Sequence, residues 1–186
     1  MAALLAAPRT DTLLRTARAL LLVLALAGLP ACGSGPSKID DESLPYSFTY
    51  PSDFESGGKA DVPARESGFD NQTIVAKENG QDLVAVQTQP LRREVTPQLV
   101  PRVNREVEQN ARRTGKVRSR KKVRVGGLDG VRFEMSLRGE TGVPVNARWI
   151  YVAKDRTLYW INCQWRSNRA AVLRACDEVM GTFKPR

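Results

Sequence analysis

The sequence has no histidine, only three cysteines among 186 residues, and no apolar run long enough to span a membrane. Without histidine, Ser-His-Asp and Cys-His catalytic groups, a histidine general base and the HExxH zinc site are excluded. The sequence also lacks a Gly-rich phosphate loop and an EF-hand pattern. We therefore expect no catalytic residue, no metal site and no cofactor. A hydrolase that uses scattered carboxylates is the enzymatic alternative, although no spacing of Asp and Glu supports it.

The N-terminus has the order of features typical of an export signal. Arg9, Arg15 and Arg18 precede the uncharged run Ala19–Leu29. This run has 11 residues, whereas a spanning helix needs about 20, so it suits the apolar region of a secretory signal peptide. The sequence Leu29-Pro30-Ala31-Cys32 then follows, and it resembles the lipobox of bacterial lipoproteins.

The lipobox resemblance implies that residues 1–31 are a removable signal and that Cys32 becomes the lipidated first residue. Acyl chains such as palmitate would then anchor the protein at the outer face of a bacterial cell membrane, at about 0.8 kcal/mol per buried CH2. Pro30 departs from the family, which usually has Ala, Ser, Thr or Val there. The alternative is an ordinary signal peptide cut nearby, in which Cys32 has no role.

Beyond the signal, the composition predicts one folded domain after a short linker. The 155 remaining residues are enough for a single hydrophobic core. Residues 33–45 are small, polar and acidic, so residues 32–45 are predicted to be the lipidated cysteine and a flexible tether. Fully extended, this tether reaches roughly 40 Å. Residues 46–186 are predicted to form the domain.

Within the domain, apolar periodicity and turn signals predict strands and two helices. Asn79-Gly80 is a strong hairpin turn signal, Thr96 is the expected N-cap of the first helix, and Asn168 is the expected N-cap of the second. The expected strands are residues 46–50, 72–77, 82–89, 116–125, 131–137, 143–153 and 157–165, and the expected helices are residues 97–113 and 169–180.

Cys163 and Cys176 are predicted to form a disulfide bond, because they are an even remainder in an exported protein. Tyr159, Ile161, Cys163 and Trp165 share one apolar face of the last strand, which should meet the helix that carries Cys176. A bond that closes a loop of about 14 residues would stabilise the domain by roughly 3 kcal/mol. Two buried thiols are the alternative.

Several motifs together resemble the PsbP/DcrB-like lipoproteins of actinobacteria. They are the opening YSFTYPSDF, the hairpin VGGLDGVRFE and the closing MGTFKP. The resemblance implies an α+β fold, an antiparallel sheet flanked by helices in a PsbP-like α/β/α sandwich. It also implies an accessory or binding role without catalytic residues. Gly127 and Gly130 would shape the hairpin, Phe183 would lie against the sheet, and the cysteines match a pair seen in many exported members.

A strongly basic strand is the first candidate binding surface. Arg118, Arg120, Lys122 and Arg124 alternate along it and should share one face. Four like charges on one face must meet water or anions. They predict docking on anionic lipid or a cell-wall polymer, whereas nucleic acid is a poor partner for an exported protein. The alternative is a solvated edge strand protected from aggregation by its charge.

The face of the last strand that carries Trp160, Asn162 and Gln164 is the second candidate. Trp149 and Tyr151 lie on the neighbouring strand, and aromatic rings beside amides can hold a sugar or a lipid headgroup. The alternative is an ordinary core with a hydrogen-bonded edge. The prediction is a non-enzymatic envelope lipoprotein of unknown ligand, and the alternative role is a scaffold for protein partners in envelope assembly or transport.

Overall fold

The structure is a computed structural model that describes residues 35–57, 70–77, 81–139 and 142–186. Its centre is a seven-stranded antiparallel sheet in the order β3-β4-β5-β9-β8-β7-β6. The strands are β3 (Glu55–Ser56), β4 (Asp70–Ala76), β5 (Leu83–Pro90), β6 (Gly115–Val125), β7 (Leu128–Arg138), β8 (Pro144–Lys154) and β9 (Thr157–Trp165).

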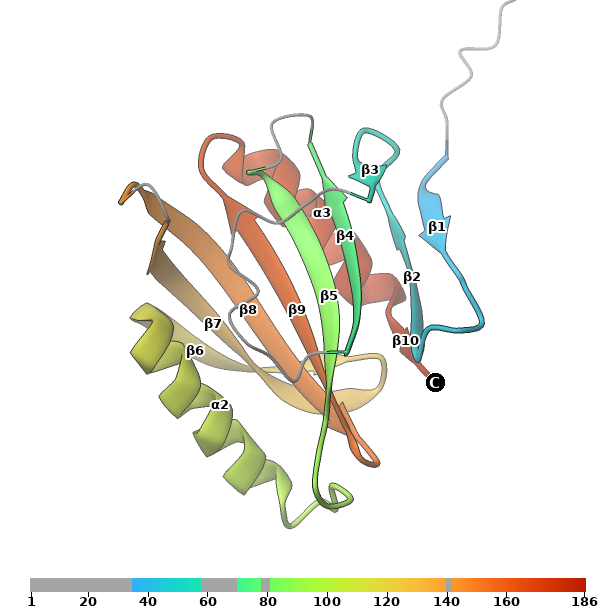
Figure 1. The fold of residues 1–186 in the computed structure, drawn as a ribbon, viewed down its shortest axis with the longest axis vertical. Coiled ribbons are helices and arrows are strands. Elements are labelled where there is room, and N and C mark those ends of the chain that lie inside the picture. Colours follow the sequence, from blue (N-terminus) through green and yellow to red (C-terminus); the bar gives the residue numbers. More distant parts are fainter. Residues whose placement is uncertain (1–34, 58–69, 78–80, 140–141) are drawn as a thin grey trace, which may run out of the picture. The chain divides into compact units, whose positions relative to one another are not determined.

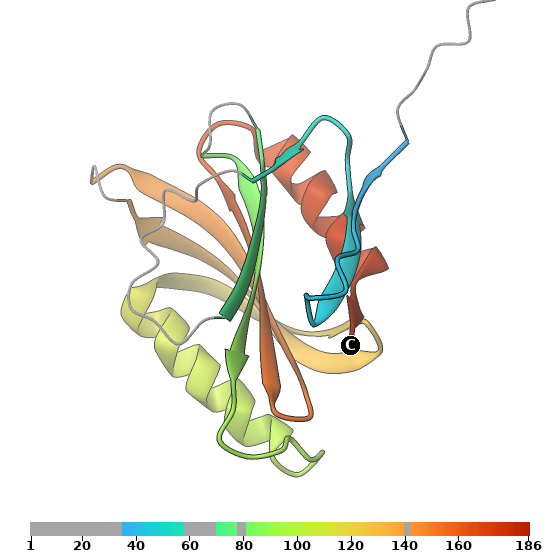
Figure 2. The same cartoon turned by 45° about the vertical axis from the view of Figure 1, so that its right-hand side comes forward.

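Two layers cover the two faces of this sheet (Figures 1 and 2). Helix α2 (Val100–Thr114) packs on β6, β7 and β8, and helix α3 (Arg169–Thr182) packs on β9 and β5 from the opposite side. A three-stranded sheet, in the order β1-β2-β10, lies beside α3. Its strands are β1 (Ser37–Ile39), β2 (Tyr46–Tyr50) and β10 (Lys184–Pro185). The predicted α+β class, with an antiparallel sheet flanked by helices, is confirmed.

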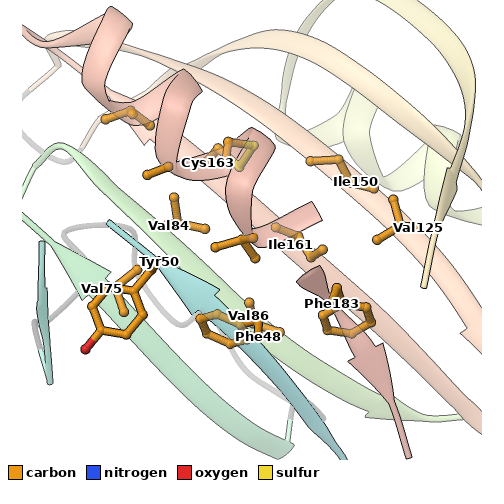
Figure 3. Close-up of a cluster of buried hydrophobic side chains, with 14 of the residues drawn as sticks. Phe48, Tyr50, Val75, Val84, Val86, Val125, Ile150, Ile161, Cys163 and Phe183 are labelled. Carbon is orange, nitrogen blue, oxygen red and sulfur yellow. A yellow bond between two sulfur atoms is a disulfide. The ribbon is translucent and has the colours of Figure 1, made fainter. Parts of the chain in front are cut away.

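The side of the large sheet toward α3, here the α3 face, carries the larger core. Its members include Val84, Val86, Ile150, Ile161 and Cys163, packed with aromatic residues of β2 (Figure 3). Cys163 and Cys176 form a disulfide bond with their Cα atoms 5.8 Å apart, as predicted. Because the bond joins β9 to α3, it ties the terminal helix to the middle of the sheet.

The opposite side, here the α2 face, carries a second core. Its members include Val131, Phe133, Trp149, Tyr151 and Trp160, packed with Val107 and Ala111 of α2. These residues alternate in sequence with those of the α3 face, because successive side chains of a strand point to opposite sides. A sheet that buries side chains on both faces explains why β8 and β9 read as almost continuous apolar runs.

The hairpin between β6 and β7 is built as the family resemblance implied. Gly127 has φ +79°, which favours glycine. At Gly130 a Cβ atom would lie 2.1 Å from the Tyr151 carbonyl oxygen, so only glycine allows β7 to approach β8 there. Phe183 is buried, and its ring lies 5.5 Å from that of Tyr159 on the sheet.

The prediction that Thr96 caps the first helix is wrong. The helix begins at Val100 with Leu99 as its N-cap, and no side chain caps it. A start at Pro97 would place Pro101 in the second turn, where its missing N–H and its ring disrupt the helix. With the later start, Pro101 lies in the first turn, where a missing N–H has no cost. The predicted cap of α3 is confirmed, because the Asn168 side chain accepts a hydrogen bond from Ala171 N.

The folded domain begins earlier than the predicted boundary at residue 46. Strand β1 pairs with β2 inside the predicted tether. The side chain of Arg186 forms an ion pair with Asp40, and its Nη1 donates a 2.6 Å hydrogen bond to the Asp41 carbonyl oxygen. The Asp40 side chain and the Asp41 backbone, in the segment expected to be a solvated linker, therefore bind the side chain of Arg186. The signal, Cys32 and the Asn79-Gly80 turn lie outside the described residues.

Candidate functional site

The basic strand is β6, which forms one edge of the seven-stranded sheet. Arg118, Arg120, Lys122 and Arg124 are all exposed. The register places Arg120 opposite Phe133 and Lys122 opposite Val131, on the α2 face. The register shifts between Val117 and Ser119, so Arg118 is an extra residue without a cross-strand partner. The shared face is therefore observed for three of the four residues, and Arg118 lies at the irregularity.

Positive charge is concentrated in α2 and β6. Residues 100–125 contain ten basic and two acidic residues, a formal charge of +8. The other residues of the chain contain 19 basic and 18 acidic residues, so the formal +9 of the whole chain comes almost entirely from this segment. We call residues 100–125 the basic segment. Most of the sequence is thus electrically balanced, and one exposed edge is not.

Two of the four predicted residues lie within ion-pair distance of a carboxylate. Arg120 Nε lies 3.0 Å from the carboxylate of Glu108 on α2. Arg124 Nε lies 3.8 Å from Asp129 and donates a 3.1 Å hydrogen bond to the Gly127 carbonyl oxygen. Within the described ranges, neither Arg118 nor Lys122 has a carboxylate within ion-pair distance.

Two further cations of β6 were not in the predicted set. Lys116 and Lys121 are opposite Ser136 and Arg132, on the α3 face, and neither has an acidic partner in the described part of the chain. The prediction chose every second residue of the strand, so it left out Lys116 and Lys121. Both could have been included from the sequence, because an edge strand exposed to solvent can carry charged side chains on both of its faces. The free cations of β6 therefore lie on either side of its backbone.

A charged group on the adjacent α3 face is internally balanced. Arg148 donates to Glu134 at 2.8 Å and to Asp177 of α3 at 2.8 Å, and its side chain is 11% exposed. Arg132 Nε lies 3.6 Å from the same Glu134 carboxylate. These contacts join β7 and β8 to α3, and the formal charges of the two arginines and two carboxylates cancel. We assign this group a structural role.

The second predicted set, Trp160, Asn162 and Gln164, lies on the α2 face, away from α3, as expected. The structure buries all three side chains, at 9%, 3% and 1% exposure. Trp160 packs with the neighbouring aromatic residues of β8, with ring centroids 4.8 Å from Trp149 and 5.8 Å from Tyr151. Burial strongly raises the pKa of Tyr151, against a smaller opposing effect of Asn110 on α2, so this hydroxyl stays protonated.

The described ranges contain neither a spanning helix nor a metal-ligand group. No helix in them is long and apolar enough to cross a membrane. No cluster of three or more Cys, Asp or Glu residues in them is arranged to hold a metal ion.

Comparison with known proteins identifies the fold. No family model matches the sequence, and no curated protein matches it. The solution structure of cyanobacterial PsbP (CyanoP) from Synechocystis sp. PCC 6803 matches with a TM-score of 0.53 at 13% identity, over 86% of this chain and 99% of that one. A crystal structure from Bacteroides thetaiotaomicron VPI-5482 matches with a TM-score of 0.55 at 13% identity, over 80% of this chain and 48% of that one.

A third solved structure is LpqN, involved in cell envelope biogenesis of Mycobacterium tuberculosis. It has a TM-score of 0.42 at 11% identity, over 84% of this chain and 86% of LpqN. The two matches with TM-scores above 0.5, at 13% identity, show the fold alone. The protein therefore has a PsbP-like α+β fold, as the sequence motifs implied.

Proposed function

We propose that this protein is a membrane-anchored envelope lipoprotein whose domain is a non-enzymatic accessory module that docks its basic segment on anionic phospholipid. The observation that carries the proposal is the concentration of charge: a formal +8 in residues 100–125 of a chain that is otherwise nearly neutral. Each Lys or Arg near an anionic membrane contributes about 1 kcal/mol of binding. The free cations of β6 are exposed and available for such contacts.

The short distance between the proposed anchor and the folded domain supports membrane contact. Four residues separate Cys32 from Ser37, the first residue of β1. Extended, this segment reaches roughly 17 Å, less than half the reach of the tether predicted from sequence. Because Arg186 holds the residues after β1, a lipid on Cys32 would keep the domain close to the membrane surface.

The docking is tested with the non-lipidated chain from Gly33 onward and vesicles of phosphatidylglycerol or phosphatidylcholine. We expect binding to the anionic vesicles alone, weakened by salt. Arg118→Ser with Lys122→Ser should reduce the affinity roughly 30-fold, because two free cations are lost. The matched pair Arg120→Ser with Arg124→Ser removes the same charge from residues that already have acidic neighbours, so its effect should be smaller.

Two outcomes would contradict the proposal in different ways. Equal losses in the two pairs would show that the diffuse field of the basic segment acts, and would reject local contacts at Arg118 and Lys122. Failure of the unaltered chain to bind anionic vesicles would overturn phospholipid docking.

The anchor is tested separately by the intact mass of the protein purified from its membrane. We expect a chain that starts at Cys32 and carries acyl groups, and that gains two hydrogens when the Cys163–Cys176 bond is reduced. An unacylated chain that starts elsewhere would make this a freely secreted protein. The docking proposal would then lose the anchor that keeps the domain near a membrane.

A further inference from the structure

A cluster of buried polar atoms without hydrogen-bond partners lies on the α2 face of β8 and β9. Its members are Trp149 Nε1, Asn162 Oδ1, and both Nε2 and Oε1 of Gln164. The register brings them together, because Trp149 is directly opposite Asn162, and Gln164 is the next residue of β9 on the same face. We call these three residues the amide–indole cluster.

Buried polar atoms without hydrogen-bond partners are costly, so their presence in one cluster needs a physical explanation. Most buried side-chain polar atoms in native proteins have a partner, and each orphaned atom costs about 1–3 kcal/mol. Apart from Trp149, the cross-strand neighbours that share this face with the two amides are Leu83, Ala85 and Ala147, and none of these three has a side-chain polar atom. Within the described residues, α2 lies over β6, β7 and β8, and no helix covers this face of β5 and β9. Within the described residues these atoms therefore have no partner, and a group from outside this part of the chain would have to supply one.

The chemistry of the cluster defines what could satisfy it. It offers two donors, the Trp149 indole N–H and the Gln164 amide, and two acceptors, the Asn162 and Gln164 oxygens. If the oxygen and nitrogen of the Gln164 amide are exchanged, the cluster still offers the same donors and acceptors, because both of these atoms lack a partner. None of the three residues or their cross-strand neighbours on this face is charged. A partner must therefore be uncharged, and it must both donate and accept hydrogen bonds at neighbouring positions.

We propose that the amide–indole cluster is a binding site for a small, uncharged polyhydroxyl ligand. Adjacent hydroxyl groups of such a molecule each donate and accept, which matches the mixed set of orphaned atoms. The rings of Trp149 and Trp160, whose centroids are 4.8 Å apart, supply apolar surface for its C–H groups. This site differs from the basic segment in chemistry, so its binding should be insensitive to salt and independent of vesicle docking.

The test uses the purified protein in a phosphocholine detergent, which carries no hydroxyl groups. D-glucose and myo-inositol are the probes, and the indole N–H resonance of Trp149 and the heat of binding are the readouts. We expect both probes to shift the Trp149 resonance and to bind equally at low and high salt. Gln164→Met, which removes two orphaned atoms and keeps the unbranched shape, should weaken binding about tenfold or more.

Gln87→Met is the matched control, because Gln87 is on β5, shares this face and is opposite Trp160. It is buried, but it has no atom in the orphaned set. Binding should be unchanged in this variant. Asn162→Leu provides a second test of the cluster if Gln164→Met does not fold. If neither probe shifts the Trp149 resonance, or if the Gln87 and Gln164 variants lose binding equally, the proposal is overturned.

Discussion

Several buried polar groups of the seven-stranded sheet differ between its two faces in how well their hydrogen bonds are satisfied. On the α3 side, Asp82 is fully buried, and its carboxylate accepts hydrogen bonds from the backbone N–H groups of Arg166, Ser167 and Asn168 and from the Ser167 hydroxyl. Tyr46 is also buried, and its hydroxyl donates to the carbonyl oxygens of Asn71 and Val86. On the α2 side, Asn162 Oδ1 and both amide atoms of Gln164 are also buried, and they lack hydrogen-bond partners among the described residues.

This difference separates a side whose buried polar groups are satisfied within the domain from a side on which we propose a ligand site. The α3 face has a disulfide bond, a larger core and polar groups that position the start of α3. The α2 face has the amide–indole cluster, and its outer edge is the basic segment. Polar groups that are satisfied within the domain stabilise it, whereas unsatisfied ones can gain only by binding something else.

The largest expected change in the free energy of unfolding follows from substitution of Asp82. Asp82→Ala should lower the free energy of unfolding by about 4 kcal/mol, because it orphans several buried donors before α3. Chemical denaturation measures this loss. The control is Asp177→Ala, which removes an exposed carboxylate that contacts Arg148, and it should cost less than about 1 kcal/mol. If both variants lost a similar free energy of unfolding, the contribution of these carboxylates to stability would not depend on their burial.

The next effect concerns the disulfide bond of the α3 face. Cys163→Ala combined with Cys176→Ala should lower the free energy of unfolding by about 3 kcal/mol, because the unfolded chain is no longer cross-linked. Denaturation of the oxidised and reduced wild-type protein should reproduce this difference. The double variant itself should not respond to reductant, and a wild type equally indifferent to reductant would contradict the bond.

Tyr46 gives a pH-dependent test of the same face. Burial raises the pKa of Tyr46 from 10.0 to about 12. The neutral hydroxyl is thus favoured in the folded state, so its stabilisation is intact below pH 10 and is lost as the pH rises from about 10 to 12. Tyr46→Phe should cost about 1–2 kcal/mol at neutral pH and reduce this alkaline loss. The control Tyr50→Phe, on the same strand, should show the same decrease in stability at alkaline pH as the unaltered protein. Denaturation of the three proteins at pH 7 to 12 measures this decrease.

The smallest expected effect has the opposite sign and lies on the α2 face. Gln164→Met should raise the free energy of unfolding of the ligand-free protein by about 1 kcal/mol, because it removes two orphaned polar atoms from the interior. Thermal and chemical denaturation measure the gain. A loss of about 2 kcal/mol or more would mean that buried water already satisfies the amide, and the contrast between the two faces would disappear.

Local patterns in the sequence predicted most of the fold. Alternating apolar residues placed β6 to β9 within a few residues of their observed bounds, and the shared face of Tyr159, Ile161 and Cys163 predicted the disulfide bond to Cys176. Asn168 was recognised as a cap because its side chain acts within a few residues of itself. The failure at Thr96 is also local, since Pro101 decides where α2 begins.

The sequence by itself determined the strand periodicity, the cysteine pairing, the alternation that separates the two faces and the excess of positive charge in residues 100–125. Each follows from residues close together in the chain. The tertiary structure alone decided that Glu108 pairs with Arg120, that Arg186 binds Asp40, and that the Gln164 amide has no partner among the described residues. Hydrogen bonds and ion pairs depend on which side chains from distant segments come within about 3 to 4 Å, and packing sets those distances.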